Sequence, residues 1–375
     1  MRIAAISNSR IPSVTANSIQ AMKVCEALAQ LGHNVRLMAP RETPAVDWKH
    51  LASHYGLKDE FPVEWLSSRR GLRRLDFVWY ARAAARRHGA DLVYTWLPQS
   101  AAVEAWVRRP VILEMHADVA GRMGGWWLRQ LWRSPRGRLL VTTAALRGAL
   151  ERSTRMQFPN DAVQITPNGV DLERYEGLPG PEEARGRLQL PGVLTVGFTG
   201  HFYAGRGIEL LFELARALPG LHFLWVGGTS EAVSIWREKL QAANVRNVTL
   251  TGFVENMRLP LYQAACEVLL MPYGSSIAAS SGQEIGEVIN PMKMFEYMAV
   301  RRPIITSDLP AIREVLNDSM AVFCPPGDAG VWKAAVLALA SDPNRRVELA
   351  GNARREVEMY TWLRRERRAL EGLEI

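Results

Sequence analysis

Residues 290–307 read N-P-M-K-M-F-E-Y-M-A-V-R-R-P-I-I-T-S, and this stretch predicts an apolar helix followed by a buried strand. One acidic side chain, Glu296, lies within the apolar helix. Asn290 can act as the N-cap and Pro291 as the first helical residue. The helix then begins with backbone N–H groups that favour an anion. Taken alone, a single glutamate in a helix is more often a solvated surface residue.

The same alternation of short apolar runs and helical stretches continues outward along the chain. Residues 13–30 predict an amphipathic helix that Gly32 ends. Alternation of this kind indicates βαβ units and parallel sheets, and it favours two doubly wound halves, although a (β/α)₈ barrel stays open. Residues 178–183, L-P-G-P-E-E, are the best candidate for a linker. The predicted strands are residues 3–7, 35–38, 92–95, 111–114, 195–199, 222–226, 248–251, 268–271 and 303–306.

Length and composition agree with two globular domains. The chain has 375 residues, of which 48% are hydrophobic, enough for two buried cores. Cys25, Cys266 and Cys324 lack the spacing of metal ligands or of a disulfide framework, which favours a reducing cytoplasm. No run approaches the roughly 18 apolar residues of a membrane span, and the first residues read as a strand rather than a signal peptide. The sequence predicts a soluble or peripheral protein of the cytoplasm.

A glycine-rich turn, G-F-T-G-H-F-Y-A-G-R-G at residues 197–207, connects a predicted strand to a predicted helix. Glycines let a backbone approach phosphates closely, and the following helix start favours negative charge. From Gly200 the turn nearly matches a P-loop, but Arg206 replaces the lysine and Gly207 replaces the hydroxyl that would hold magnesium. The spacing of a dinucleotide fingerprint is also missing, so NAD is not supported. A purely structural turn remains an alternative.

Four segments follow one another between residues 165 and 308: I-T-P-N-G-V-D at 165–171, the glycine-rich turn, L-T-G-F-V at 250–254, and the helix around Glu296. In this order they resemble the second half of the large retaining glycosyltransferase family 4, the glycosyl transferases group 1. The resemblance implies an α/β protein of the GT-B fold, with two Rossmann-like doubly wound domains facing a central cleft. The implied domains are an N-terminal acceptor-binding domain at residues 1–187, a C-terminal sugar-nucleotide-binding domain at 188–355, and a helix crossing back to the first domain at 356–375.

The resemblance also implies roles for individual residues. Arg206 and His201 occupy the basic positions that meet the donor diphosphate in the family, and Glu296 matches the glutamate that holds the donor ribose. The family has another glutamate eight positions earlier, and here that position is Val288, which puts the usual contact to a sugar hydroxyl in doubt. The expected donor-binding residues are Gly200, His201, Arg206, Phe253, Glu287, Val288, Ile289, Asn290, Met292 and Glu296, and the expected catalytic residues are His116, Arg206 and Glu296.

The first half of the chain resembles the family less. His116 follows a predicted strand at a place where members of the family often put a histidine facing the donor sugar. A histidine satisfied by nearby backbone is an equal alternative. Ser13, Thr15 and Asn17 in the opening loop could contact a ligand near the cleft, but capping of the next helix is favoured for these residue types.

The implied function is transfer of a sugar from a UDP- or GDP-linked donor to a glycan, lipid-linked or other envelope acceptor. The resemblance implies retention at the reacting carbon and chemistry without a metal or other cofactor. The alternatives are a non-catalytic protein of this fold and one that modifies the sugar nucleotide itself, as an epimerase does.

Basic residues gather in the first half. Residues 1–187 hold 27 Lys and Arg against 18 Asp and Glu, whereas the remainder holds 19 against 20. Residues 69–74, Arg86, Arg87 and the segment 122–138 combine cations with Trp126, Trp127 and Trp132, a mixture that suits an anionic membrane surface. Solvated arginines and buried tryptophans are the alternative. A nucleic-acid partner is not supported, because no recognition motif accompanies the charge.

Overall fold

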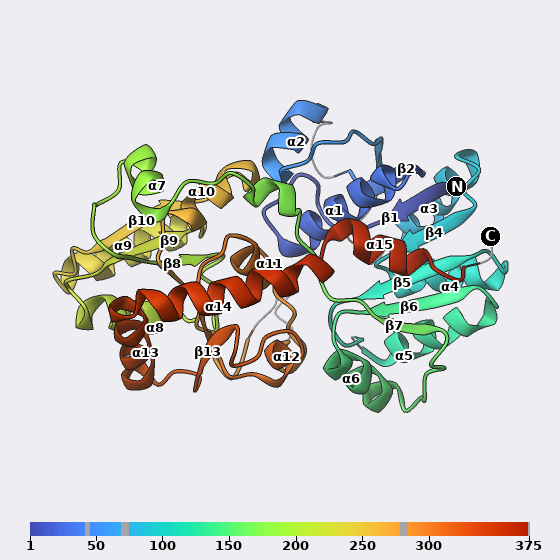
Figure 1. Cartoon of the computed structure of the whole chain (residues 1–375). Helices are drawn as coiled ribbons and strands as arrows, with labels where there is room; N and C mark the ends of the chain where they lie inside the picture. Colours follow the sequence, from blue (N-terminus) through green and yellow to red (C-terminus); the bar gives the residue numbers. More distant parts are fainter. Residues whose placement is uncertain (42–45, 69–74, 120, 278–283, 374–375) are drawn as a thin grey trace. The chain divides into compact units, whose positions relative to one another are not determined.

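The computed structural model describes residues 1–41, 46–68, 75–119, 121–277 and 284–373. These residues form two compact units, each with one parallel sheet. Unit 1 comprises Met1–Asn168 and Trp362–Ile375, and unit 2 comprises Gly169–Thr361. The prediction of two doubly wound halves is confirmed, and the single barrel is excluded (Figure 1).

The sheet of unit 1 has the strand order β3-β2-β1-β4-β5-β6-β7. The order reverses between β1 and β4, where Ile3 pairs with both Val35 and Leu92. Ligands of open parallel sheets bind outside the carboxyl ends of the strands at such a switch point. The strands are β1 Arg2–Ile6, β2 Asn34–Pro40, β3 Val63–Leu66, β4 Leu92–Thr95, β5 Val111–Met115, β6 Gly137–Val141 and β7 Val163–Ile165.

The helices of unit 1 include one from the far end of the chain. This helix, α15, packs against α1, so the end of the chain belongs to the unit that holds its start (Figure 1). The helices are α1 Ala16–Gln30, α2 Trp48–Tyr55, α3 Leu75–Arg87, α4 Pro98–Trp106, α5 Gly121–Gln130, α6 Ala144–Thr154 and α15 Trp362–Leu370.

The sheet of unit 2 has the order β10-β9-β8-β11-β12-β13, with its switch point between β8 and β11. The glycine-rich turn follows β8 and Pro272 follows β11, so both lie at this switch point. The strands are β8 Thr195–Thr199, β9 His222–Val226, β10 Val248–Gly252, β11 Val268–Met271, β12 Ile304–Ser307 and β13 Ala321–Cys324. The helices are α7 Pro181–Leu188, α8 Ile208–Ala217, α9 Ser230–Ala242, α10 Leu259–Ala264, α11 Met292–Ala299, α12 Pro310–Arg313, α13 Ala329–Ser341 and α14 Pro343–Glu356.

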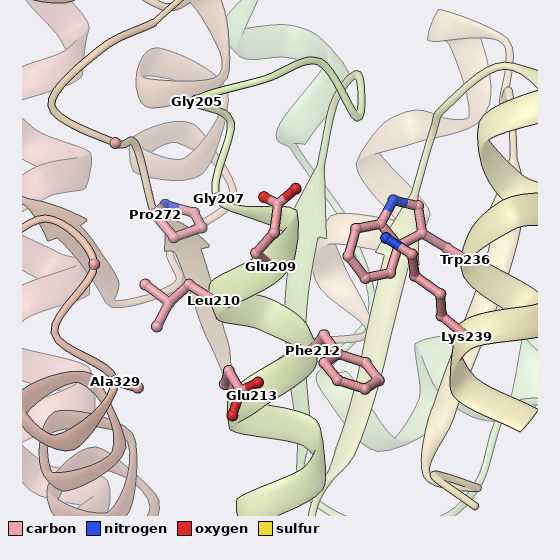
Figure 2. A pocket seen from close by; sticks show the side chains of 12 residues that line it. Gly205, Gly207, Glu209, Leu210, Phe212, Glu213, Trp236, Lys239, Pro272 and Ala329 are labelled. Atoms are coloured by element: carbon pink, nitrogen blue, oxygen red, sulfur yellow. The ribbon is translucent and has the colours of Figure 1, made fainter. Parts of the chain in front are cut away.

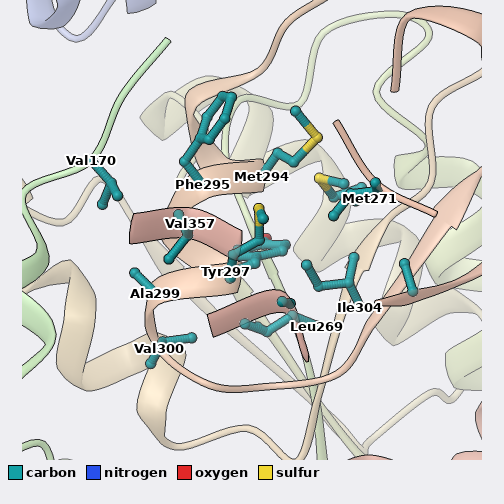
Figure 3. Close-up of a cluster of buried hydrophobic side chains, with 14 of the residues drawn as sticks. Val170, Leu269, Met271, Met294, Phe295, Tyr297, Ala299, Val300, Ile304 and Val357 are labelled. Carbon is teal, nitrogen blue, oxygen red and sulfur yellow. The ribbon is translucent and has the colours of Figure 1, made fainter. Parts of the chain in front are cut away.

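Two apolar clusters cover the two faces of the unit 2 sheet. Val268 and Leu270 of β11 join one cluster, whereas Leu269 and Met271 join the other, as the alternation of side chains along a strand requires. Phe295 and neighbouring residues of α11 pack into the second cluster (Figure 3). The prediction of an apolar helix followed by a buried strand is confirmed, and Glu296 lies half-buried on that helix.

The predicted domain boundary at residue 187 falls inside unit 2. Tyr175 and Ala184 belong to the core of that unit, and Arg185 lies 2.7 Å from the carboxylate of Glu267. The linker prediction is also wrong, because Pro181 is at the start of α7, where proline and acidic residues are favoured. At the other end, the chain stays in unit 2 until Thr361, because Val170 N donates to Tyr360 O at 2.9 Å.

The three cysteines are buried and free. Among the described residues, no helix combines the length and the apolar character that crossing a membrane requires.

Candidate functional site

The glycine-rich turn between β8 and α8 packs backbone against backbone. Gly205 and Gly207 have φ values of 76° and 81°, which glycine adopts readily. A Cβ at Gly207 would lie 1.8 Å from the carbonyl oxygen of Pro272, and one at Gly205 would lie 2.0 Å from that of Ser276. The turn therefore needs glycine at both positions to lie against the chain that follows β11.

Two cations converge beside this turn. The guanidinium carbon of Arg206 and the ammonium nitrogen of Lys293 each lie 5.5 Å from the ring centre of Tyr273. Lys293 also lies 4.0 Å from the ring centre of Phe198, and a Cβ at Gly200 would come within 2.7 Å of its ammonium nitrogen. The glycine at position 200 thus leaves the space that the lysine head group occupies.

The cation pair is electrostatically unfavourable in the free protein. Burial lowers the pKa of Lys293 well below its usual value, Arg206 lowers it further, and Glu296 opposes both. The Nε atom of Arg206 is buried and has no hydrogen-bond partner among the described residues. A bound anion would offset both the burial of Lys293 and the charge of Arg206, so the arrangement is suited to an anion.

Glu296 lies on α11, one turn after Lys293. Its Oε2 accepts a hydrogen bond of 2.8 Å from Nε2 of Gln263, a fully buried residue of α10. Burial raises the pKa of the Tyr175 hydroxyl, and the nearby charge of Glu296 raises it further. The carboxylate is therefore oriented by an amide and bordered by a tyrosine that stays protonated.

The start of α11 differs from the prediction. Pro291 is the N-cap, with extended dihedrals of φ −78° and ψ 130°, and Met292 is the first helical residue. The predicted cap, Asn290, is buried one position earlier. The 3₁₀ turn Gly286–Val288 and the extended Ile289 precede Asn290, and the helix begins one residue later than predicted.

The segment just before α11 contains two exposed glutamates, Glu284 and Glu287. Val288 is buried, whereas Glu287 is exposed. Glu284 accepts hydrogen bonds from the backbone nitrogens of Ile277 and Gly286, at 2.7 and 2.8 Å. These bonds, with one from Ser276, hold its pKa below the usual value. The hydrogen bonds of the Glu284 carboxylate are therefore made within its own segment of the chain.

The other predicted donor residues of unit 2 lie on two loops. The His201 ring stacks on Tyr203, with ring centres 4.8 Å apart and planes 12° apart. Phe253 follows β10 and its side chain is 49% exposed.

In unit 1, His116 follows β5 and its Nε2 lies 2.8 Å from Oε1 of Glu114. His116 thus pairs with a carboxylate, whereas the alternative interpretation expected a backbone partner. Thr15 is the N-cap of α1, but its side chain makes no capping hydrogen bond. Its hydroxyl instead pairs with Ser13 at 2.9 Å, and Asn17 is exposed within the helix. The capping prediction is therefore right for the position of Thr15 and wrong for the bond.

A pocket of about 450 Å³ borders the glycine-rich turn on the side of α8 (Figure 2). Trp236 and Lys239 of α9 line one wall, with the ammonium nitrogen 4.3 Å from the Trp236 ring centre. Gly205 and Gly207, the two neighbours of Arg206 in the chain, line this pocket, whereas Arg206, Lys293 and Glu296 are not among its lining residues.

Comparison with known families accounts for most of the chain. Residues 18–174 match Glycosyltransferase Family 4, and residues 193–342 match the family described as Glycosyl transferases group 1. The chain belongs to the family 4 glycosyltransferases. The family predicted from the four sequence segments is thereby confirmed, and with it an enzyme that transfers sugar from a nucleotide-sugar donor.

Named relatives of this glycosyltransferase are distant. The phosphatidyl-myo-inositol mannosyltransferase of Mycobacterium leprae is 24% identical over 372 residues, covering 91% of this chain and 88% of the relative. The D-inositol 3-phosphate glycosyltransferase of Xylanimonas cellulosilytica is 27% identical over 61% of this chain and 57% of the relative. TuaH of Bacillus subtilis is 26% identical over 43% of this chain, which spans only 38% of TuaH.

Solved structures confirm the GT-B fold of the glycosyltransferase. Sucrose-phosphate synthase from Thermosynechococcus elongatus superimposes with a TM-score of 0.75 at 19% identity, over 98% of this chain and 97% of that one. HepE of Anabaena, solved with UDP-glucose, gives a TM-score of 0.75 at 16% identity, over 100% and 99% of the two chains.

Some residues of the site are not singled out by the sequence pattern. Lys293 carries a usable signal, because it lies three positions before Glu296 and so on the same side of one helix. Gln263 and Tyr175 carry none, since each comes from a distant segment and meets Glu296 only in the folded unit. The basic residues 69–74 lie outside the described residues.

Proposed function

We propose that unit 2 binds the donor through its diphosphate and ribose, with Arg206 and Lys293 on the diphosphate and Glu296 on the ribose. The convergence of the two cations on Tyr273, beside the glycine-rich turn, carries this proposal. Guanidinium and ammonium groups both bind phosphate oxygens, the former in bidentate geometry. The backbone N–H groups at the start of α11 add favourable dipoles, although Pro291 contributes none.

The same groups lower the barrier to transfer. Breaking the bond between sugar and phosphate places negative charge on the leaving diphosphate. Arg206 and Lys293 stabilise that charge because they already face its position and need no reorganisation. His201 and the remaining donor residues of the sequence prediction, Gly200, Phe253, Glu287, Val288, Ile289, Asn290 and Met292, border the proposed donor. The stabilising charges come from the protein, so the proposed reaction needs no metal ion.

The sugar is proposed to be transferred with retention from a UDP- or GDP-linked donor, and His116 to contact it near the reacting carbon. Retention rests on the family resemblance. The solved structure of HepE with UDP-glucose supports a uridine donor, and the name of one relative, a mannosyltransferase, supports mannose as a candidate sugar. The configuration of the product at its new glycosidic bond, measured by NMR, decides between retention and inversion.

A lipid-linked acceptor at the inner face of an anionic membrane is the second part of the proposal. The helices α3, α4 and α5 expose Trp79 by 57%, Tyr80 by 50%, and Trp106 and Trp126 by 42% each. Exposed aromatic rings among arginines suit a membrane interface. The name of the phosphatidyl-myo-inositol mannosyltransferase supports a lipid acceptor. Arginines on or next to these helices are Arg82, Arg86, Arg87, Arg108, Arg109 and Arg129.

Turnover of a sugar nucleotide by the purified protein tests the donor site. UDP-, GDP- and ADP-linked sugars are supplied with a lipid extract, and the products are separated by mass spectrometry. Arg206→Ala should lower transfer at least about tenfold, because it removes one positive charge that stabilises the leaving diphosphate. Arg216→Ala, at an exposed arginine in the last turn of α8, the helix that follows the glycine-rich turn, is the control.

Normal turnover in Arg206→Ala would remove Arg206 from the donor site. An altered sugar nucleotide without any acceptor would instead indicate an epimerase.

A further inference from the structure

Glu114, at the end of β5, is a buried carboxylate with hydrogen-bond donors from several elements. Its Oε1 accepts from Gln20 of α1 at 2.7 Å and lies 2.8 Å from Nε2 of His116. Tyr94 of β4 donates to the other oxygen, and Arg365 of α15 donates to Oε1. Glu114 is 1% exposed, whereas the His116 side chain is 24% exposed, so the imidazole is the part of this cluster that reaches the surface.

Arg365 holds this cluster together from the C-terminal helix. Its guanidinium is buried, contacts both Glu114 and Glu366, and donates from Nε to the carbonyl oxygen of Pro167 at 2.9 Å. Burial alone would lower the pKa of Arg365, but the two carboxylates raise it, so the arginine stays charged. A buried arginine that lost its carboxylate partner would be strongly destabilising.

The two buried carboxyl groups, Glu114 and Glu366, have pKa values shifted in opposite directions. Burial would raise the pKa of Glu114, but Arg365 and His116 lower it to about 2, and it stays ionised. Burial raises the pKa of Glu366, Arg365 opposes this, and the charge of Glu114 raises it further. The two interacting carboxyls thereby titrate in different pH ranges, and Glu114 is the one that stays ionised near neutral pH.

An ionised carboxylate only accepts hydrogen bonds, so the imidazole nitrogen that faces it must carry hydrogen. In the neutral ring of His116 this places the hydrogen on Nε2 and leaves Nδ1 as the acceptor. A hydroxyl group, such as that of a sugar, can then donate to Nδ1.

We propose that Glu114 and Arg365 are positioning residues, which fix His116 in the Nε2–H tautomer so that Nδ1 accepts a hydrogen bond from the sugar. Arg365 is thus the means by which the last helix of the chain contributes to transfer. This inference rests on the proposed contact between His116 and the donor sugar, whereas the tautomer itself does not depend on it.

The tautomer is measured by ¹⁵N NMR of imidazole-labelled protein without donor, and the His116 signal is assigned by its loss in His116→Gln. We expect the Nε2–H pattern in the wild type, a mixture of tautomers in Arg365→Gln, and wild-type behaviour in Arg367→Gln. Arg367 is an exposed arginine of the same helix and serves as the control. Arg365→Lys should restore the pattern in part, because it returns a positive charge.

Transfer assays complete the test. Arg365→Gln should lower kcat about tenfold or more with little change in the KM for the donor, because misplacing a contact near the reacting atoms acts on the reaction step. An Nδ1–H tautomer in the wild type would overturn the proposal, and that measurement needs no variant to fold. A lost tautomer with unchanged kcat would overturn it equally. If the proposed donor site of unit 2 is wrong instead, Arg206→Ala will transfer sugar normally. The His116 signal of that variant should match the wild type in either case.

Discussion

Replacing Lys293 with methionine tests the cation pair, because the change removes the charge and keeps the length of the side chain. The ammonium nitrogen lies 4.0 Å from the Phe198 ring centre and 5.5 Å from that of Tyr273. Burial and the neighbouring Arg206 both make its charge unfavourable in the free protein, and Glu296 compensates in part. We therefore expect Lys293→Met to leave the free energy of unfolding unchanged or to raise it.

Donor binding should respond in the opposite direction. A hydrogen bond to a charged group contributes about 1.5–3 kcal/mol, so its loss should weaken binding of a nucleoside diphosphate about 10- to 150-fold. Isothermal titration calorimetry compares the diphosphate, the monophosphate and the nucleoside of the same base. The loss should be largest for the diphosphate and small for the nucleoside. Lys333→Met, at an exposed lysine of α13, is the control.

Two results would refute this reasoning. Equal weakening of all three ligands would mean that Lys293 supports the fold of the site and not the diphosphate. Unchanged diphosphate affinity in a variant of wild-type stability would mean that the anion lies elsewhere.

Three further outcomes are expected. Diphosphate binding should raise the lowered pKa of Lys293, so the complex takes up protons. The affinity should therefore fall as the pH rises from the pKa of the free protein to that of the complex. Calorimetry in buffers of different ionisation enthalpy measures the proton uptake, and equal heats in all buffers would contradict it. Gly207→Ala should destabilise unit 2 by at least about 3 kcal/mol in denaturant unfolding, because φ is positive and the new Cβ would overlap the Pro272 carbonyl, whereas Gly220→Ala, with open space around it, should not. Trp126→Ser should reduce flotation with anionic vesicles, and equal absence of the wild type from anionic and neutral vesicle fractions would refute membrane contact.

The central strands could be predicted from the sequence because both of their faces are buried. β4, β8, β9 and β11 have the predicted bounds, since a strand between two helical layers is a continuous apolar run. β3 was not predicted: it is a four-residue edge strand whose side chains are all half-buried and include the charged Glu64. β6, β7 and β13 were not predicted either.

The candidate site was predictable only where one segment carries it. Arg206 and Glu296 lie in motifs whose spacing is visible along the chain. Lys293 lies in the same motif as Glu296, but Arg206, which lowers its pKa, lies on another loop. The boundary between the units was not predictable from turn residues. Pro181 and the acidic residues after it have a linker-like composition, but in unit 2 they begin a helix.

The sequence by itself determined the two parallel sheets, the family and the segments that carry Arg206 and Glu296, because strand periodicity and motif spacing are local properties of a chain. Only the tertiary structure decided which groups become partners. Arg365 and Glu114 are separated by 251 positions, yet they share one buried hydrogen bond. Burial and neighbouring charge set the ionisation of each group, and both depend on the segments that folding brings together.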